Sequence, residues 1–258
     1  MKGVDISHYQ KGLTIRQVKD AGSEFAIIKL TEGDWLEDAA AFDFYREAYE
    51  IGFPVGCYCY SHAATVEAAA NEADYLIGKL NGFPMPCGVF LDMEDPKQLE
   101  LPAKELLDIA ETWCDVIRAA GYTPGIYGSE YTLWTKLAPQ MPETDALIWV
   151  AHYGRAPELP CDLWQASDSG HIGDYEGAID IDETRSARFE ALVRQGFKDV
   201  SHIDGPEGPV MLPDAAVAVL QLLMHCDGCW KTIDGVKSPA FFKKLREYVD
   251  RLEAGTYE

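Results

Sequence analysis

Two acids lie two positions apart at the end of the apolar run VFLDMED, residues 89–95. If this run is a buried strand, Asp92 and Glu94 project from one face with their Cα atoms about 6.5 to 7 Å apart. Glycoside hydrolysis needs such a pair, because one carboxyl group must donate a proton while another is ionised. Strand-end acids also cap helices or bind cations, so the pair alone leaves these alternatives open.

Three further acids belong to the first and last predicted strands. Asp5 ends the first strand, and Asp180 and Asp182 lie in the run AIDID near the end of the last. When a barrel closes, its first and last strands become neighbours, so Asp5 and Asp180 can meet near Asp92 and Glu94. Grouped acids at a barrel mouth raise the pKa of at least one carboxyl group, and Glu94, with its longer side chain, is the better candidate proton donor. Asp180 and Asp182 point the same way by strand period, which leaves open which of them faces the cleft.

Aromatic residues gather near the same strand ends. They are Tyr58, Tyr60, Tyr127, Trp149 and Trp164. Sugar rings present apolar C–H faces and hydroxyl edges, and amphipathic aromatic side chains match both. The cluster favours a carbohydrate cleft, although core packing is an equal alternative for any single member.

Short apolar runs alternate with amphipathic segments up to about residue 185, which is typical of a parallel sheet with helices between its strands. The predicted strands are residues 3–7, 25–30, 54–62, 88–94, 123–127, 146–152, 162–166 and 178–182. Helical spacing is clearest in residues 39–51, 66–80 and 102–120. We therefore expect an α/β fold: an irregular (β/α) barrel of about eight strands and five helices, whose last strands are joined by loops. Chemistry in such barrels lies at the carboxyl ends of the strands.

The remaining chain differs in pattern, so we expect a catalytic barrel in residues 1–195 and a small helical region in residues 196–258. A turn-rich segment, residues 204–209, precedes two amphipathic stretches, residues 214–226 and 239–252. Their apolar faces must be buried by something, whether the barrel, a second copy or a bound ligand. We expect ligand binding or homo-oligomerisation, with a plain structural extension as the alternative.

The formal net charge of −21 argues against electrostatically driven binding to nucleic acid. No apolar stretch approaches the length of a transmembrane helix, and the N-terminus lacks the order of a secretory signal peptide. We expect synthesis in the cytoplasm, without membrane insertion.

Seven cysteines, an odd number, are expected to be free thiols. Cys57 and Cys59 lie in a strand-like run, and the one C-x-x-C, Cys226 to Cys229, lacks partners for a zinc site. We expect neither a metal nor a cofactor.

The stretches GVDISHYQ, FAIIKLTEG, VGCYCYSHA, VFLDMED, GYTPGIYGS, LIWVAHY, LWQAS and AIDID occur in this order over residues 1–190. In order and spacing they resemble glycoside hydrolase family 25, the muramidases first known as the Chalaropsis type. The resemblance implies an irregular barrel of five helices and eight strands. It also implies hydrolysis of the β-1,4 bond from N-acetylmuramic acid to N-acetylglucosamine in bacterial peptidoglycan, here by a phage or prophage endolysin. Such an enzyme would reach the bacterial cell wall through a phage holin, and residues 196–258 would then bind the wall or form homo-oligomers.

Carried over by position, the resemblance makes Glu94 the proton donor and Asp92 its partner carboxylate, with Asp5 and Asp180 as the other cleft acids. The sugar-contacting positions of the family are occupied here by Tyr58, Tyr127 and Trp149. The family commonly has a histidine where this chain has Cys59, a departure that concerns subsite shape rather than the acids.

Two other functions compete with a lysozyme. A catalytically silent barrel could bind the cell wall, since folds are reused without their chemistry. A different carbohydrate hydrolase, such as a metal-dependent deacetylase, is the other alternative, but no histidine pair has the spacing of metal ligands.

Overall fold

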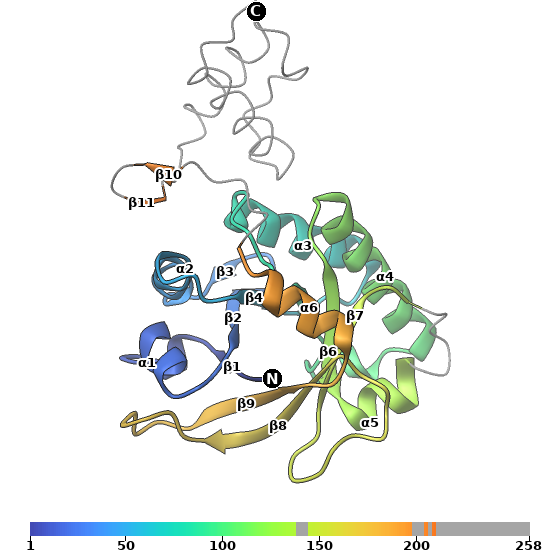
Figure 1. Cartoon of the computed structure of the whole chain (residues 1–258). Helices are drawn as coiled ribbons and strands as arrows, with labels where there is room; N and C mark the ends of the chain where they lie inside the picture. Colours follow the sequence, from blue (N-terminus) through green and yellow to red (C-terminus); the bar gives the residue numbers. More distant parts are fainter. Residues whose placement is uncertain (138–143, 198–203, 206–207, 210–258) are drawn as a thin grey trace, which may run out of the picture. The chain divides into compact units, whose positions relative to one another are not determined.

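The computed structural model describes residues 1–137, 144–197, 204–205 and 208–209. Residues Met1–Lys79 and Met85–Phe197 form one compact unit. Its strands form a closed barrel in the order β1, β9, β8, β7, β6, β5, β4, β2, and the pairing of β2 with β1 closes the ring (Figure 1). The expected eight-stranded irregular barrel is therefore confirmed.

The barrel strands lie close to their predicted positions. They are β1 (Lys2–Ile6), β2 (Phe25–Glu32), β4 (Val55–Tyr60), β5 (Val89–Asp92), β6 (Pro124–Ser129), β7 (Leu147–Ala151), β8 (Leu163–Gly170) and β9 (Ile179–Thr184). A short strand, β3 (Leu36–Glu37), pairs antiparallel with the end of β2. It was not predicted, because two residues are too few to show a period.

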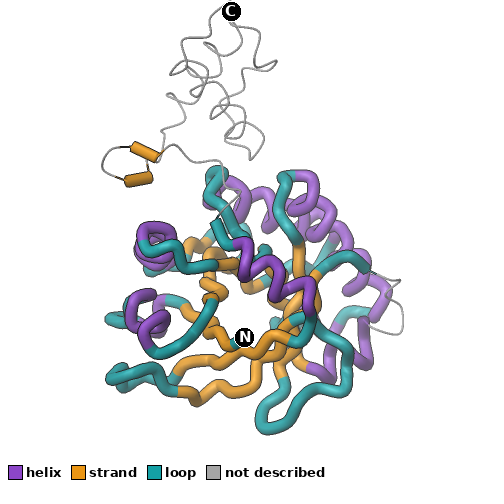
Figure 2. Tube along the Cα trace, in the orientation of Figure 1, coloured by secondary structure: helices purple, strands orange, loops and turns teal. Residues whose placement is uncertain are grey.

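Helices lie outside the ring of strands except along β8 and β9, where the chain forms loops (Figure 2). They are α1 (Ile15–Asp20), α2 (Ala41–Glu50), α3 (Val66–Leu80), α4 (Ala103–Ala119), α5 (Glu130–Thr132) and α6 (Ala187–Gln195), with the short turns η1 (His8–Gln10), η2 (Gln98–Glu100) and η3 (Leu133–Leu137). The first five connect successive strands from β1 to β7, as expected. Loops join β7 to β8 and β8 to β9, and α6 follows the last strand.

The prediction of a parallel sheet is wrong for β9. Strands β1, β2, β4, β5, β6, β7 and β8 are each parallel to the next strand in this order. Strand β9 is antiparallel to both of its neighbours, β8 and β1. With no helix between β8 and β9 the chain turns back on itself, and a reversed strand then closes the ring. Asp180 consequently lies near the start of β9, yet at the same end of the barrel as the carboxyl ends of the other strands.

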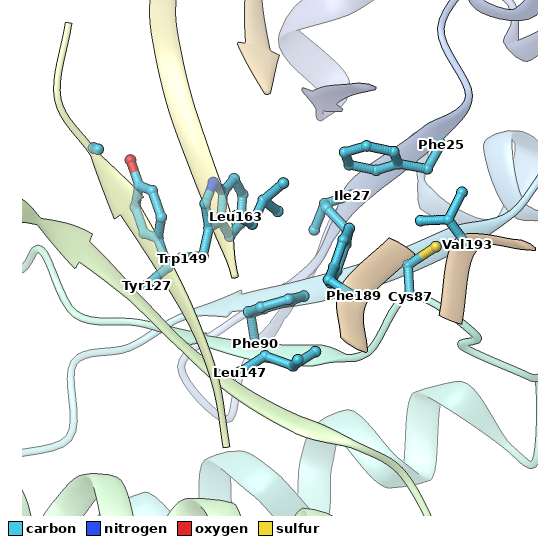
Figure 3. Close-up of a cluster of buried hydrophobic side chains, with 11 residues drawn as sticks. Phe25, Ile27, Cys87, Phe90, Tyr127, Leu147, Trp149, Leu163, Phe189 and Val193 are labelled. Atoms are coloured by element: carbon cyan, nitrogen blue, oxygen red, sulfur yellow. The ribbon is translucent and has the colours of Figure 1, made fainter. Parts of the chain in front are cut away.

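One end of the barrel is filled with apolar side chains (Figure 3). Phe25, Phe90 and Trp149 are fully or almost fully buried there, and Phe189 from α6 packs edge-on against Phe25 with ring centroids 5.3 Å apart. Gly125 makes room for this filling, since a Cβ at that position would lie 2.3 Å from the Phe90 ring. Because this end is filled, polar chemistry is confined to the opposite end.

Leu80–Pro84 and residues 198–258 form a second unit, of which few residues are described. Strands β10 (Asp204–Gly205) and β11 (Gly208–Pro209) pair antiparallel within the predicted turn-rich segment. The predicted helices 214–226 and 239–252, and the Cys226–Cys229 pair, lie outside the described residues.

Two chain-wide expectations are tested within the described residues. Their cysteines, Cys57, Cys59, Cys87, Cys114 and Cys161, are free thiols, as predicted. In the same part of the chain, no helix combines the length and apolarity needed to cross a membrane.

Candidate active site

Acidic side chains line the polar end of the barrel. Asp5 on β1 is directly opposite Asp180 on β9 in the strand register, and Asp92, the last residue of β5, is aligned with Tyr60 and Tyr127 on its two neighbours. Asp5 and Asp92 are buried, Asp180 is half-buried, and Glu94, two residues beyond β5, is exposed. The predicted acids therefore lie at one end of the barrel and differ strongly in access to solvent.

Gln165 on β8 holds two of these acids together. Its buried amide Nε2 donates to Asp5 Oδ2 at 2.8 Å and to Asp180 Oδ2 at 3.3 Å. Its Oε1 accepts hydrogen bonds from the Tyr127 hydroxyl at 2.8 Å and from the Tyr153 hydroxyl at 3.1 Å. Every polar atom of the amide is used, so the orientation of Gln165 and of both carboxyl groups is fixed.

Asp182 lies below Asp180 with none of its surface exposed. Trp149 Nε1 donates to its Oδ1 at 2.8 Å, whereas Oδ2 finds no hydrogen-bond partner among the described residues. Burial raises the pKa of Asp182 well above its usual range, an effect that the Trp149 hydrogen bond opposes and the charge of Asp180 reinforces. A neutral carboxyl group fits this position, because the effect of burial on its pKa outweighs the hydrogen bonds with Trp149 and Asp5.

Burial and like charges also act on the acid pair of β5. Loss of water raises the pKa of Asp92 well above its usual range; Glu94 raises it further and Lys29 opposes the shift. Glu94 is exposed, but its partial desolvation raises its pKa, the charge of Asp180 adds to this, and the Tyr127 hydroxyl lowers it. The surroundings thus favour a protonated carboxyl group at the end of β5, as expected from the sequence.

Lys29 places a positive charge inside this end of the barrel. Its Nζ is 2.7 Å from Glu32 Oε2 and 5.3 Å from the centre of the Tyr60 ring, and Tyr60 is aligned with Asp92. The charge therefore lies beside the β5 acids and favours the ionised form of Asp92. Within the described ranges, no group of three or more His, Cys, Asp or Glu side chains is arranged to hold a metal ion.

Replacing Asp182 by Asn is expected to stabilise the protein at neutral pH. The pKa of Asp182 is higher in the folded protein than in the unfolded chain, where it is about 3.9. The stability that Asp182 contributes is therefore complete below about pH 3.9 and is lost as the pH rises through the folded pKa. Asn still accepts from Trp149 and loses no proton, so its advantage should grow above about pH 4, by up to about 1.4 kcal/mol per pH unit. Urea unfolding of both proteins across this range measures the difference; parallel pH curves would contradict a neutral Asp182.

The predicted aromatic residues separate into two groups. Three tyrosines point into the barrel beneath or beside the acids: Tyr58, Tyr60 and Tyr127. Tyr58 and Tyr60 are partly buried, and Tyr127 is buried. The expectation of sugar contact needs correction for Trp149 and Asp182, which have at most 1% of their surface exposed.

Trp164 also needs correction, because it lies on the outer face of β8. Its neighbours Leu163 and Gln165 are buried inside the barrel, and alternate residues of a strand point to opposite faces. Its Nε1 donates to the His152 carbonyl at 2.7 Å, and the Arg185 guanidinium lies 5.7 Å from its ring. Trp164 therefore does not share the space occupied by the acids.

Sequence reasoning missed Gln165, Tyr153 and Lys29. Gln165 lies within the stretch LWQAS, in which strand alternation places a polar side chain on the same face as Leu163. Lys29 similarly interrupts the apolar run FAIIKL. A polar residue on the inward face of a buried strand was the available signal at both positions.

The model of the family described as "Glycosyl hydrolases family 25" matches residues 4–175. The chain is 28% identical over 186 residues to the autolytic lysozyme of Clostridium acetobutylicum, covering 71% of this chain but only 55% of that protein. It is 29% identical over 216 residues to lysozyme M1 of Streptomyces globisporus, covering 74% of this chain and 71% of that one.

A solved bacterial lysozyme from Streptomyces coelicolor has the same fold. The TM-score is 0.65 at 26% identity, over 76% of this chain and 97% of that structure. The family match covers most of the barrel, including β1 and β5, which carry Asp5 and Asp92. By the family match and by the barrel with its acidic end, the chain belongs to glycosyl hydrolases family 25.

Proposed function

We propose that this protein is a lysozyme, an N-acetylmuramidase that hydrolyses the β-1,4 bond between N-acetylmuramic acid and N-acetylglucosamine in bacterial peptidoglycan. Membership of family 25 and the likeness to two proteins named lysozymes support this function. The observation that carries it is the ordered set of acids, in which one exposed carboxyl group, Glu94, stands beside the buried Asp92.

The difference in exposure assigns the two roles. Glu94 is exposed and can therefore reach the glycosidic oxygen of a bound substrate, and its raised pKa keeps the proton that the leaving oxygen needs. Asp92 is buried beside Lys29, whose charge opposes the rise that burial imposes on its pKa, and it acts from below as the carboxyl group that orients the 2-acetamido group or a water molecule. Asp5 and Asp180, fixed by Gln165, complete the acidic floor of the site.

Tyr58, Tyr60 and Tyr127 are our candidates for sugar contact beside these acids, and Tyr153 joins them. Half of the Tyr153 surface is exposed while its hydroxyl is bound to Gln165. An aromatic ring anchored at one end and open at the other suits the apolar face of a sugar.

Release of soluble fragments from purified peptidoglycan sacculi tests the function. Wild-type protein should release them, and a chelator should leave the rate unchanged. Binding to sacculi without release would point instead to a wall-binding barrel, and loss of activity in chelator to a metal-dependent hydrolase.

Replacing Asp180 by Asn should move the alkaline limb of the activity profile to lower pH. Glu94 acts as an acid, so activity is present below its pKa and is lost as the pH rises through it. The charge of Asp180 raises that pKa, and its removal lowers it. Initial rates from about pH 4 to about pH 8 measure the shift, with Asp108→Asn on α4, a half-buried acid paired with Lys104, as a control. If the alkaline limb of the Asp180→Asn profile lies at the same pH as in the wild-type protein, Glu94 is not the proton donor.

We further propose that the activity belongs to residues 1–195 and that the protein acts at the bacterial cell wall, after release through a phage holin. Residues 196–258 would contribute wall binding or self-association, and neither nucleic acid nor a membrane would be a partner. Truncation after residue 195, followed by light scattering and sacculus-binding assays, separates these contributions.

A further inference from the structure

Trp35 is a large exposed aromatic residue held in a fixed position. It lies in the turn between β2 and β3, with 61% of its surface exposed. Its indole stacks on the His62 imidazole, with centroids 5.2 Å apart and planes 27° apart. It also packs closely on Gly33, where a Cβ would come within 2.2 Å of the ring and where φ is +55°. The position of the indole is thus set by its neighbours rather than by burial.

His62 is itself held from several sides. Its Nδ1 pairs with Asp95 Oδ2, its Nε2 lies 3.2 Å from Glu32 Oε1, and the Tyr60 ring meets it edge-on at 5.1 Å. The second oxygen of Asp95 accepts from the backbone N–H of Lys97 at 2.7 Å. The support for Trp35 is therefore a connected set of hydrogen bonds and ring contacts that leaves the indole little freedom.

This set is continuous with the candidate active site. Asp95 follows Glu94 directly, and Tyr60 is aligned with Asp92 across β4 and β5. Trp35, His62 and Glu94 all follow the carboxyl ends of barrel strands, namely β2, β4 and β5. A glycan strand bound across the acids can thus extend towards Trp35.

The chemistry around Trp35 fits a sugar ring. An indole offers a flat apolar face, and the exposed Asp34 offers carboxylate oxygens to hydroxyl and acetamido N–H donors, whereas both oxygens of Glu32 are already paired with Lys29 and His62. The Asp34 carboxylate also repels the free carboxylates of peptide stems. The charge therefore favours a neutral N-acetylhexosamine over a stem peptide.

We propose that Trp35, oriented by His62, is a stacking platform for an N-acetylhexosamine ring of the glycan strand outside the acid site. This inference rests on the proposed lysozyme function and adds a binding position to it. Trp35 supplies affinity for longer glycan strands and takes no part in bond cleavage.

The test compares Trp35→Ala with Trp35→Phe and with Tyr75→Ala, a control aromatic on α3. On peptide-free glycan strands, Trp35→Ala should raise KM about tenfold with kcat unchanged, whereas Trp35→Phe should keep most of the affinity and Tyr75→Ala all of it. Direct binding of the same strands, measured by calorimetry with each substitution in a Glu94→Gln background, should weaken by the same factor.

An unchanged KM and affinity in Trp35→Ala would overturn the platform. So would a loss that appears only with peptide-bearing strands, which would make this a stem-peptide site. If wild-type protein cleaves no peptidoglycan at all, the proposed function fails; if it cleaves normally and Trp35→Ala matches it, only the platform fails.

Discussion

Replacing Glu94 by Gln is expected to reduce peptidoglycan turnover by about 10²- to 10⁴-fold while the protein stays folded. The amide has nearly the same shape as the acid but cannot give a proton to the leaving glycosidic oxygen. Because Glu94 is exposed, the substitution disturbs no packed core. The rate of soluble fragment release measures the effect.

A matched control separates lost chemistry from lost structure. Glu67→Gln changes an exposed glutamate in the first turn of α3 and should keep the wild-type rate. Both variants should unfold at the same urea concentration as the parent. A Glu94→Gln protein with wild-type turnover would mean that another group is the acid, and Asp92 would be examined next.

Replacing Phe189 by Ala is expected to lower the free energy of unfolding by about 3 to 5 kcal/mol. Phe189 is fully buried on α6 and packs on Phe25 where the barrel is filled (Figure 3). Its removal leaves a cavity that the surrounding strands, tied into a closed ring, cannot collapse to fill. Urea denaturation monitored by tryptophan fluorescence gives the difference.

The exposed face of the same helix provides the control. Arg194→Ala removes a surface ion pair with Glu190 and should change stability by less than about 1 kcal/mol. The comparison matters because α6 lies beyond the family match at residues 4–175. A Phe189→Ala effect as small as that of Arg194→Ala would mean that α6 does not stabilise the barrel.

Local pattern was sufficient for the three longer helices that connect the strands, but not for the short α1 and α5, which were given no range. Helix α3 spans the predicted residues 66–80, and α4 differs from its prediction by one residue at each end. These helices bury one face, so their apolar spacing is visible in the sequence. The direction of β9 has no such local signal, because it depends on how the chain turns between β8 and β9.

The acids of the site were predictable for a different reason. Asp5 and Asp92 end apolar strands, and barrel geometry brings strand ends together whatever their spacing in sequence. Strand alternation does not show how deep in the barrel an inward side chain lies. Asp182 and Trp149 both point inward, yet they lie too far from the open end of the barrel to be exposed. Gln165 could be noticed in the sequence as an inward polar residue, but its role became clear only from its contacts with two carboxyl groups and two tyrosines.

The most direct test of the central claim identifies the bond that the protein cuts. Purified protein is incubated with insoluble peptidoglycan, and the released fragments are reduced with borohydride and analysed by mass spectrometry. The proposed muramidase activity predicts fragments that end in reduced N-acetylmuramic acid. Fragments that end in reduced N-acetylglucosamine, or glycan strands left intact in walls of several chemotypes, would contradict it.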